Sequence, residues 1–151
     1  MVGRFGDQKA PYQINSDSWK AIRDYSEKRH PGTVRIAVIG DSYIEALNAP
    51  PEAAVAAVLE KRLSRRGQGR GVSLRVSGAS LGHYLAMMRY VRTRFSPDFY
   101  IINIVHNDFE DSLPRMDRAV FHAVRRAGDS YEEVPPRSTS RSYPGGSWLS
   151  T

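Results

Sequence analysis

Short apolar runs alternate along the chain with longer segments in which apolar residues recur every three or four positions. The short runs cover residues 34–39, 72–76 and 99–105, and runs of this kind are typical of strands. The longer segments cover about 50–66 and 83–95 and are typical of amphipathic helices. The order strand, helix, strand, helix, strand predicts a parallel sheet with right-handed crossovers in an α/β fold.

Two weaker patterns predict helices outside this alternation. Trp19, Ile22 and Tyr25 are spaced three apart and predict a short helix before the first strand. Residues 113–127 also carry apolar side chains at helical spacing and predict another helix.

Composition along the chain suggests three parts. Residues 1–32 are polar and turn-rich and form a lead-in segment. Residues 33–134 contain the predicted α/β domain. Residues 135–151 are rich in Pro, Ser, Arg and Gly, which predicts an irregular or disordered tail.

A small polar residue or a glycine follows each predicted strand of the alternating region. Ser42 follows the first strand, Gly78 the second and Asn107 the third. Ligands of parallel α/β sheets bind outside the carboxyl ends of the strands. We therefore expect these three residues to converge on one edge of the sheet, although they lie far apart in the sequence.

Serine, glycine and asparagine are residue types that ester cleavage through a serine nucleophile requires. The Gly40-Asp41-Ser42 turn allows a sharp exit from the strand and exposes Ser42 as a candidate nucleophile. The Ser42 N–H, the Gly78 N–H and the Asn107 side-chain amide are candidate donors to the oxyanion. Structural roles are the alternative, with Ser42 and Asn107 as helix caps, Gly78 as a turn glycine and Asp41 holding the serine turn.

The composition narrows the chemistry. The chain has 151 residues, of which 40% are hydrophobic and 25% charged, as is usual for one globular domain. It has no cysteine, which excludes disulfides, a thiolate nucleophile and cysteine-ligated zinc. The net charge is +6, but the arginines are scattered and form no recognised nucleic-acid motif, so we expect no nucleic-acid partner. Residues 1–13 have no signal-peptide pattern and no stretch approaches a membrane span, so a cytoplasmic location is the default expectation.

The strand-end motifs resemble a known family, the SGNH (GDSL-type) hydrolases. Residues 39–43, Ile-Gly-Asp-Ser-Tyr, resemble its block I. Residues 76–79, Val-Ser-Gly-Ala, resemble block II, and residues 105–108, Val-His-Asn-Asp, resemble block III, usually written Gly-x-Asn-Asp. Residues 12–17 resemble a lead-in of many bacterial members, so that the resemblance covers about 12–134.

The resemblance implies a flavodoxin-like three-layer α/β/α fold and hydrolysis of carboxylic esters, often acetyl or acyl groups on carbohydrates or lipids. It implies no metal and no organic cofactor. By position it implies Ser42 as the nucleophile, with Gly78 and Asn107 in the oxyanion hole. His106 and Asp108 are then candidates for substrate contact, although Asp108 is expected chiefly to hold its loop.

The chain also departs from the family pattern. Val105 stands where block III usually has glycine, and Arg75 stands where block II often has a small residue. Block V, Asp-x-x-His, carries the catalytic base and the residue that orients it, and the chain contains no such tetrapeptide. We therefore expect a sheet truncated after its third strand, an impaired esterase, and self-association through the uncovered sheet edge.

Other interpretations remain open. A non-catalytic binding module or a degenerate hydrolase fragment would keep the pocket without the base. A nucleotide-binding domain is disfavoured because no glycine-rich phosphate loop follows the first strand. His106 is the histidine nearest to the site in the sequence, but neighbours in extended chain point to opposite faces, so we do not expect it to replace the missing base.

Overall fold

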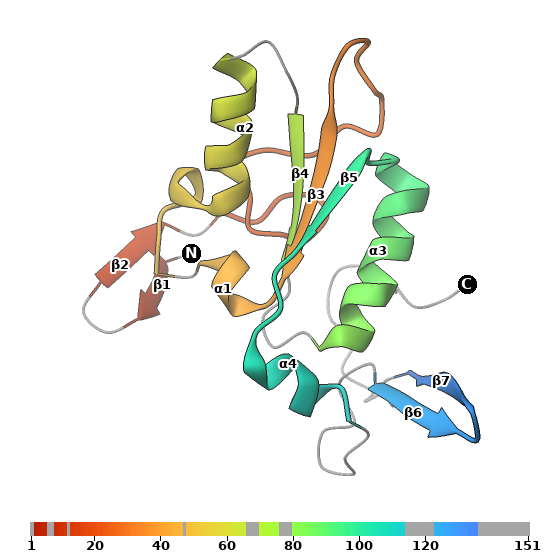
Figure 1. The fold of residues 1–151 in the computed structure, drawn as a ribbon. Helices are drawn as coiled ribbons and strands as arrows, with labels where there is room; N and C mark the ends of the chain where they lie inside the picture. The colour runs from red at the N-terminus through yellow and green to blue at the C-terminus, as the bar shows by residue number, and fades with distance from the viewer. Residues whose placement is uncertain are drawn as a thin grey trace.

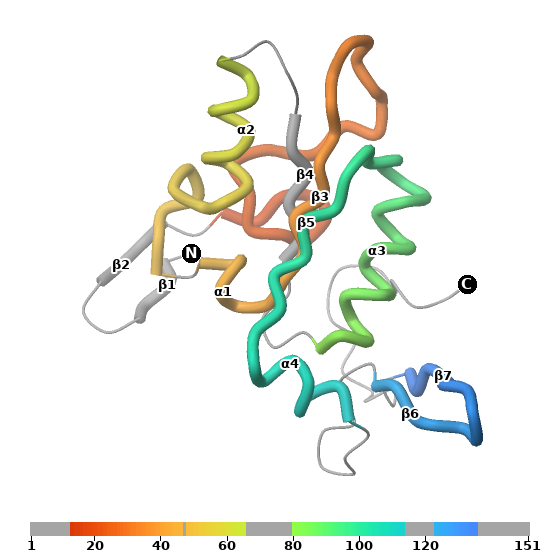
Figure 2. The backbone as a smooth tube through the Cα atoms, viewed as in Figure 1, coloured from red at the N-terminus to blue at the C-terminus, as the bar shows by residue number. Residues whose placement is uncertain are grey.

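A three-stranded parallel sheet forms the centre of the molecule, in the order β4-β3-β5. The computed structural model describes residues 2–5, 8–11, 13–46, 48–65, 70–75, 80–113 and 123–135. Figure 2 shows the path of the chain, with β3 entered from one end of the sheet and both α1 and α4 at the other end.

The middle strand is the one that the apolar pattern predicts. β3 is Arg35–Gly40, β4 is Arg70–Arg75 and β5 is Phe99–Ile102. Residues 37–39 of β3 have no exposed surface, because a strand lies on each side and helices cover both faces. The strand predicted over residues 34–39 is confirmed, with bounds shifted by one residue.

The two faces of β3 pack against different helices, because successive side chains of a strand point to opposite faces. Ala37 and Ile39 join a core with α3, which is Leu81–Phe95. Val38 packs against α2, which is Val55–Arg65. Figure 1 shows α2 and α3 on opposite sides of the sheet, so the described elements form an α/β/α arrangement.

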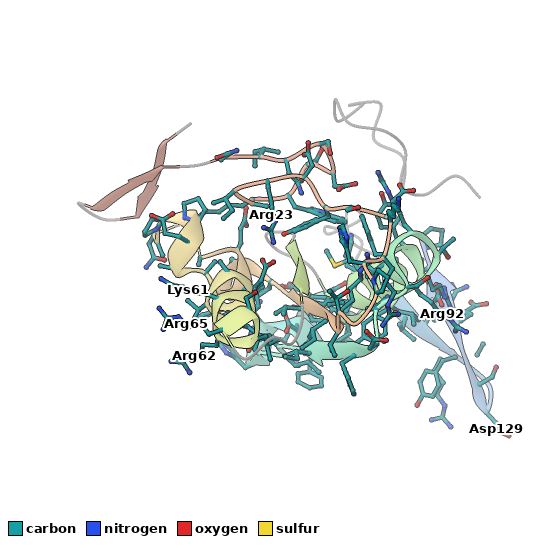
Figure 3. The ribbon with its side chains drawn as sticks, turned by 90° about the horizontal axis from the view of Figure 1, so that it is seen from above. Arg23, Lys61, Arg62, Arg65, Arg92 and Asp129 are labelled. Atoms are coloured by element: carbon teal, nitrogen blue, oxygen red, sulfur yellow. The ribbon has the colours of Figure 1, made fainter. Side chains whose placement is uncertain are left out.

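The helix predicted from residue 50 is interrupted near its start. Pro51–Ala53 form a short 3₁₀ helix, η1, and Ala54 is extended with φ −66° and ψ 146°. The α-helix itself begins only at Val55. Figure 3 shows the basic side chains of its outer face directed away from the sheet: Lys61, Arg62 and Arg65.

The short helix predicted around Trp19 is wrong, because residues 13–34 form turns and bends. The side-chain oxygen of Asn15 accepts hydrogen bonds from the N–H groups of Asp17 (3.1 Å) and Trp19 (2.9 Å). These bonds take backbone donors away from a helix. Trp19 is 1% exposed whereas Ile22 is 50% exposed, so the two side chains do not share one buried face.

Within the part of the chain that the structure describes, two antiparallel hairpins lie outside the central sheet, and the apolar pattern predicted neither. β1 (Val2–Phe5) pairs with β2 (Gln8–Pro11) within the lead-in segment. β6 (Ala123–Ala127) pairs with β7 (Ser130–Val134) through a two-residue turn that contains Gly128 at φ 63°.

The second hairpin overturns part of the helix predicted over residues 113–127. Residues 123–127 are strand, and residues 114–122 lie outside the described residues. The strand is stabilised by pairing with the downstream strand β7, which includes an ion pair between Arg125 and Glu132. The spacing of apolar residues within one segment gives no information about such a partner.

β5 is an edge strand within the described part of the chain, and its outer side carries no strand. Its apolar side chains are correspondingly exposed, with Phe99 at 60% and Ile101 at 43%. The uncovered edge expected from the sequence is therefore present, and self-association through it stays a prediction. Among the described helices, none has the length and apolar character needed to cross a membrane.

Candidate active site

Ser42 is the first residue of α1 (Ser42–Glu45), which follows β3 directly. Asp41 caps this helix, and its side chain accepts a hydrogen bond from the Tyr43 N–H at 3.0 Å. The Asp41 backbone carbonyl also accepts from the N–H groups of Ile44 and Glu45. Asp41 therefore holds the serine turn, as expected, and Ser42 itself is partly exposed beside it.

Gly40 allows α1 to fold back closely onto the end of β3. A Cβ atom at this position would lie 3.1 Å from the Ile44 Cβ and 3.2 Å from the Asn103 Cβ, and it would also meet the Ile44 Cγ1. These approaches are too close for a side chain to fit without displacing α1. The glycine is thus required by packing, between the Ser42 turn and the residue that follows β5.

Asn107 lies in the first turn of α4 (His106–Asp111), at the carboxyl end of β5. Its side-chain amide donates to Asp111 Oδ2 at 3.4 Å, which orients the amide. Asp108 is fully buried, and its Oδ2 accepts from the Val105 N–H at 2.7 Å. Asp108 therefore holds the turn that starts α4, which is the role expected for it.

Ser42 and Asn107 lie at the same edge of the sheet. β3 and β5 are adjacent and parallel, so the residues that follow them emerge on the same side. Figure 1 shows α1 and α4 together at this end. The third predicted residue, Gly78, lies outside the described residues.

A buried polar group from α3 lies close to these two turns. Burial raises the pKa of the Tyr84 hydroxyl well above its usual value, and the negative charges of Asp108 and Asp41 raise it further. Burial also raises the pKa of Asp41, and the nearby Asp108 adds to the rise. Tyr84 is therefore protonated at neutral pH. The position of Tyr84 beside these two carboxylates could not be predicted from the sequence, because Tyr84 fits the apolar stripe of its helix.

Ser112, the C-cap of α4, connects this helix with the first turn of α3. Its hydroxyl donates to the Asp108 carbonyl at 2.5 Å and accepts from the Leu81 N–H at 2.8 Å. Ser80, the N-cap of α3, contacts His83 Nδ1 through its hydroxyl at 3.1 Å. The beginning of α3 is thus held against the C-terminal end of α4.

The described histidines differ in their relation to this edge. His106 is exposed and begins α4, next to Asn107. The extended-chain argument used for His106 is wrong, because the two residues occupy one helical turn and their side chains do not point to opposite faces. His30 precedes β3 at the other end of the sheet, and His122 lies outside the described residues.

The described residues contain no cluster of His, Cys, Asp and Glu able to hold a metal ion. At the edge where β3 and β5 end, they place a serine at the start of one helix and an asparagine amide in the first turn of the next.

Comparison with known proteins identifies the family. The family model of the GDSL-like lipase/acylhydrolases matches residues 36–136, which is more than half of the chain. The chain therefore belongs to the GDSL-like lipase/acylhydrolase family, whose members hydrolyse esters. No curated protein and no solved structure gives a significant match.

The raised pKa of Asp41 gives a pH-dependent prediction. A folded-state pKa above the unfolded value means that this group lowers stability as pH rises from about 3.8 through the folded pKa. Asp41→Asn keeps an N-cap acceptor and removes the buried charge. We expect the variant to gain stability relative to the parent at pH 7, with the gain shrinking toward pH 4, in urea denaturation across that range.

Asp24→Asn is the matched control with the opposite sign. Hydrogen bonds from Ser16 lower the pKa of Asp24, so its stabilising contribution is present at neutral pH and is lost as pH falls through the folded pKa. A stability difference for Asp41→Asn that grows as pH falls would contradict the assigned cause.

Proposed function

We propose that this chain is an SGNH-type serine esterase domain in which Ser42 is the nucleophile. The observation that carries the proposal is the pairing of two helix starts at one sheet edge, Ser42 on α1 after β3 and Asn107 on α4 after β5. Membership of an ester-hydrolysing family supports it. The substrate class that we propose is an acetyl or acyl ester of a carbohydrate or lipid.

In the proposed reaction, Ser42 Oγ attacks the ester carbonyl and its proton passes to a base. The carbonyl oxygen becomes an oxyanion, which accepts hydrogen bonds from the Ser42 N–H, the Gly78 N–H and the Asn107 amide. The Ser42 N–H suits this role because the first N–H groups of a helix lack intrahelical partners. The alcohol then leaves, and water hydrolyses the acyl-serine.

We also propose a flavodoxin-like arrangement for the complete sheet. The order β4-β3-β5 is second, first, third in sequence among these parallel strands. This matches the beginning of the flavodoxin-like order 2-1-3-4-5. In that arrangement the next strand would lie against the exposed edge of β5.

A non-catalytic binding module is the second candidate function. The chain has no Asp-x-x-His tetrapeptide, so the motif that supplies base and orienter in the family is missing from it. A module of this kind would bind an ester through the same oxyanion donors without cleaving it.

Labelling with a fluorophosphonate tests the proposal, because the reagent captures an active-site serine covalently. We expect the label on Ser42 when the modified peptide is mapped by mass spectrometry, and none on Ser42→Ala. Asn107→Ala should slow labelling by about 10²–10³-fold, as expected for loss of one oxyanion donor.

The matched control is Ser64→Ala on α2, an exposed position. It should label at the parent rate. Labelling that is indifferent to Ser42→Ala would reject the nucleophile and leave the binding module as the better candidate.

A further inference from the structure

Lys20 is a buried cation in the segment that precedes the sheet. Its side chain is enclosed, and the residue is 1% exposed. Lysine is almost never fully buried unless its charge is compensated. Here the Lys20 Nζ donates to the carbonyl oxygens of Ala46 at 2.5 Å and Ala49 at 2.7 Å. Both acceptors belong to the loop that leaves the nucleophile helix.

Helix α1 and the residues that follow it have little local stability of their own. α1 has only four residues, too few to be stable as an isolated helix. Its C-cap, Ala46, has a left-handed backbone with φ 47° and ψ 56°, which is unfavourable for a residue with a Cβ atom. The carbonyls at the end of a helix lack intrahelical donors and carry partial negative charge. The Ala46 carbonyl also accepts from the Ala49 N–H at 3.0 Å, so the Lys20 ammonium is a second, charged donor that opposes this partial charge.

The backbone of Lys20 is itself held firmly. Lys20 pairs with Ile14 in an isolated antiparallel bridge, and the Ala21 N–H donates to the Gln13 carbonyl at 3.1 Å. The preceding residue, Trp19, is packed among aromatic rings, with centroids 5.8 Å from Tyr25 and 6.1 Å from Phe95. The lysine therefore connects a fixed point in the core with the end of α1.

We propose that Lys20 is a positioning residue for Ser42. It restrains the end of α1 and so keeps the first turn, with the Ser42 hydroxyl and N–H, in the geometry for attack. This role rests on the proposed function. It also assigns residues of the segment before β3 to the support of the site.

Two measurements on Lys20→Met test the proposal, since methionine has a similar length but cannot donate. Amide hydrogen exchange in residues 44–50 should become at least about tenfold faster, because two carbonyls lose a charged donor. Exchange in residues 99–102 should stay within about twofold of the parent, because the two carbonyls that Lys20 bonds follow α1 and do not belong to β5. Fluorophosphonate labelling should slow at least about tenfold in its maximal rate, with the half-saturating concentration little changed, as expected for misplaced reacting groups.

Lys20→Gln, which keeps a neutral donor, should give intermediate values in both measurements. Lys61→Met is the matched control, because Lys61 lies on the outer face of α2 (Figure 3). It should match the parent throughout.

Unchanged exchange in residues 44–50 would overturn the proposal. Equal acceleration across α3 and β5, or loss of the cooperative unfolding transition in both Lys20 variants, would overturn it as well, because Lys20 would then support the whole fold. The exchange measurement makes no use of serine chemistry. Labelling that persists in Ser42→Ala would therefore reject the proposed function, while the exchange result would still decide whether Lys20 restrains α1.

Discussion

Hydrolysis of an activated acetate ester by this chain is expected to be slow, and its acceleration by an added base is expected to depend on Ser42. A serine hydroxyl is a poor nucleophile at neutral pH without a base. The sequence has no Asp-x-x-His to supply one. A site that retains oxyanion donors and substrate binding accelerates such reactions by about 10³–10⁴-fold over water. A positioned general base would contribute about a further 10²–10⁴-fold.

The hydrolysis rate should be compared in the parent, Ser42→Ala and Ser64→Ala, with and without added imidazole. Imidazole is a small diffusible base that also cleaves activated esters by itself. After its rate without protein is subtracted, we expect it to accelerate the parent and Ser64→Ala but not Ser42→Ala. A fast reaction without imidazole would contradict the prediction and imply a histidine of this chain as the base. His106→Ala would then be the decisive variant, because His106 begins α4 at the site's edge.

Truncation of Trp19 is expected to cause the largest loss of stability that we predict. Trp19 is 1% exposed, and its ring packs near Tyr25, Tyr90 and Phe95. Replacing a buried tryptophan by alanine costs about 3–5 kcal/mol, through lost burial and the cavity that remains. Small domains have total unfolding free energies of about 5–15 kcal/mol, so Trp19→Ala removes a large part of it.

Urea denaturation of Trp19→Ala and Ile22→Ala provides the measurement and its control. Ile22 belongs to the same segment but is 50% exposed, so its truncation should change the unfolding free energy by about 0.5 kcal/mol or less. Similar losses for both variants, or no loss for Trp19→Ala, would show that the segment before β3 does not share the core.

Local patterns predicted the order of elements in the central α/β unit, although the strand expected over residues 99–105 ends at Ile102. The apolar run before Gly40 predicted a buried strand, and the strand is buried on both faces. The helical spacing over residues 83–95 predicted α3, which begins two residues earlier. Strand and helix periodicities differ enough to be distinguished within one segment, and their alternation implies parallel pairing. The motif after β3 also indicated the family that the comparison established.

Local patterns failed where a distant partner decides the structure. Residues 123–127 have helical spacing but pair with β7 across a glycine turn. Trp19, Ile22 and Tyr25 have helical spacing too, but the Asn15 side chain takes two backbone N–H groups that a helix would use. In both cases hydrogen bonds from outside the counted positions outweigh a weak local preference.

The supporting residues of the candidate site emerged only from the tertiary structure. Ser42 and Asn107 stand in motifs that can be recognised in one dimension. Lys20 and Tyr84 do not, because one is a single lysine in a polar segment and the other fits the apolar stripe of α3. Their roles depend on contacts with groups that are distant in the sequence. The Lys20 ammonium bonds the Ala46 carbonyl, 26 residues away, and the Tyr84 hydroxyl lies near the Asp108 and Asp41 carboxylates. Only the folded chain brings these groups together. Burial then makes each polar partner necessary, because an unpaired polar group costs far more free energy inside the protein than in water.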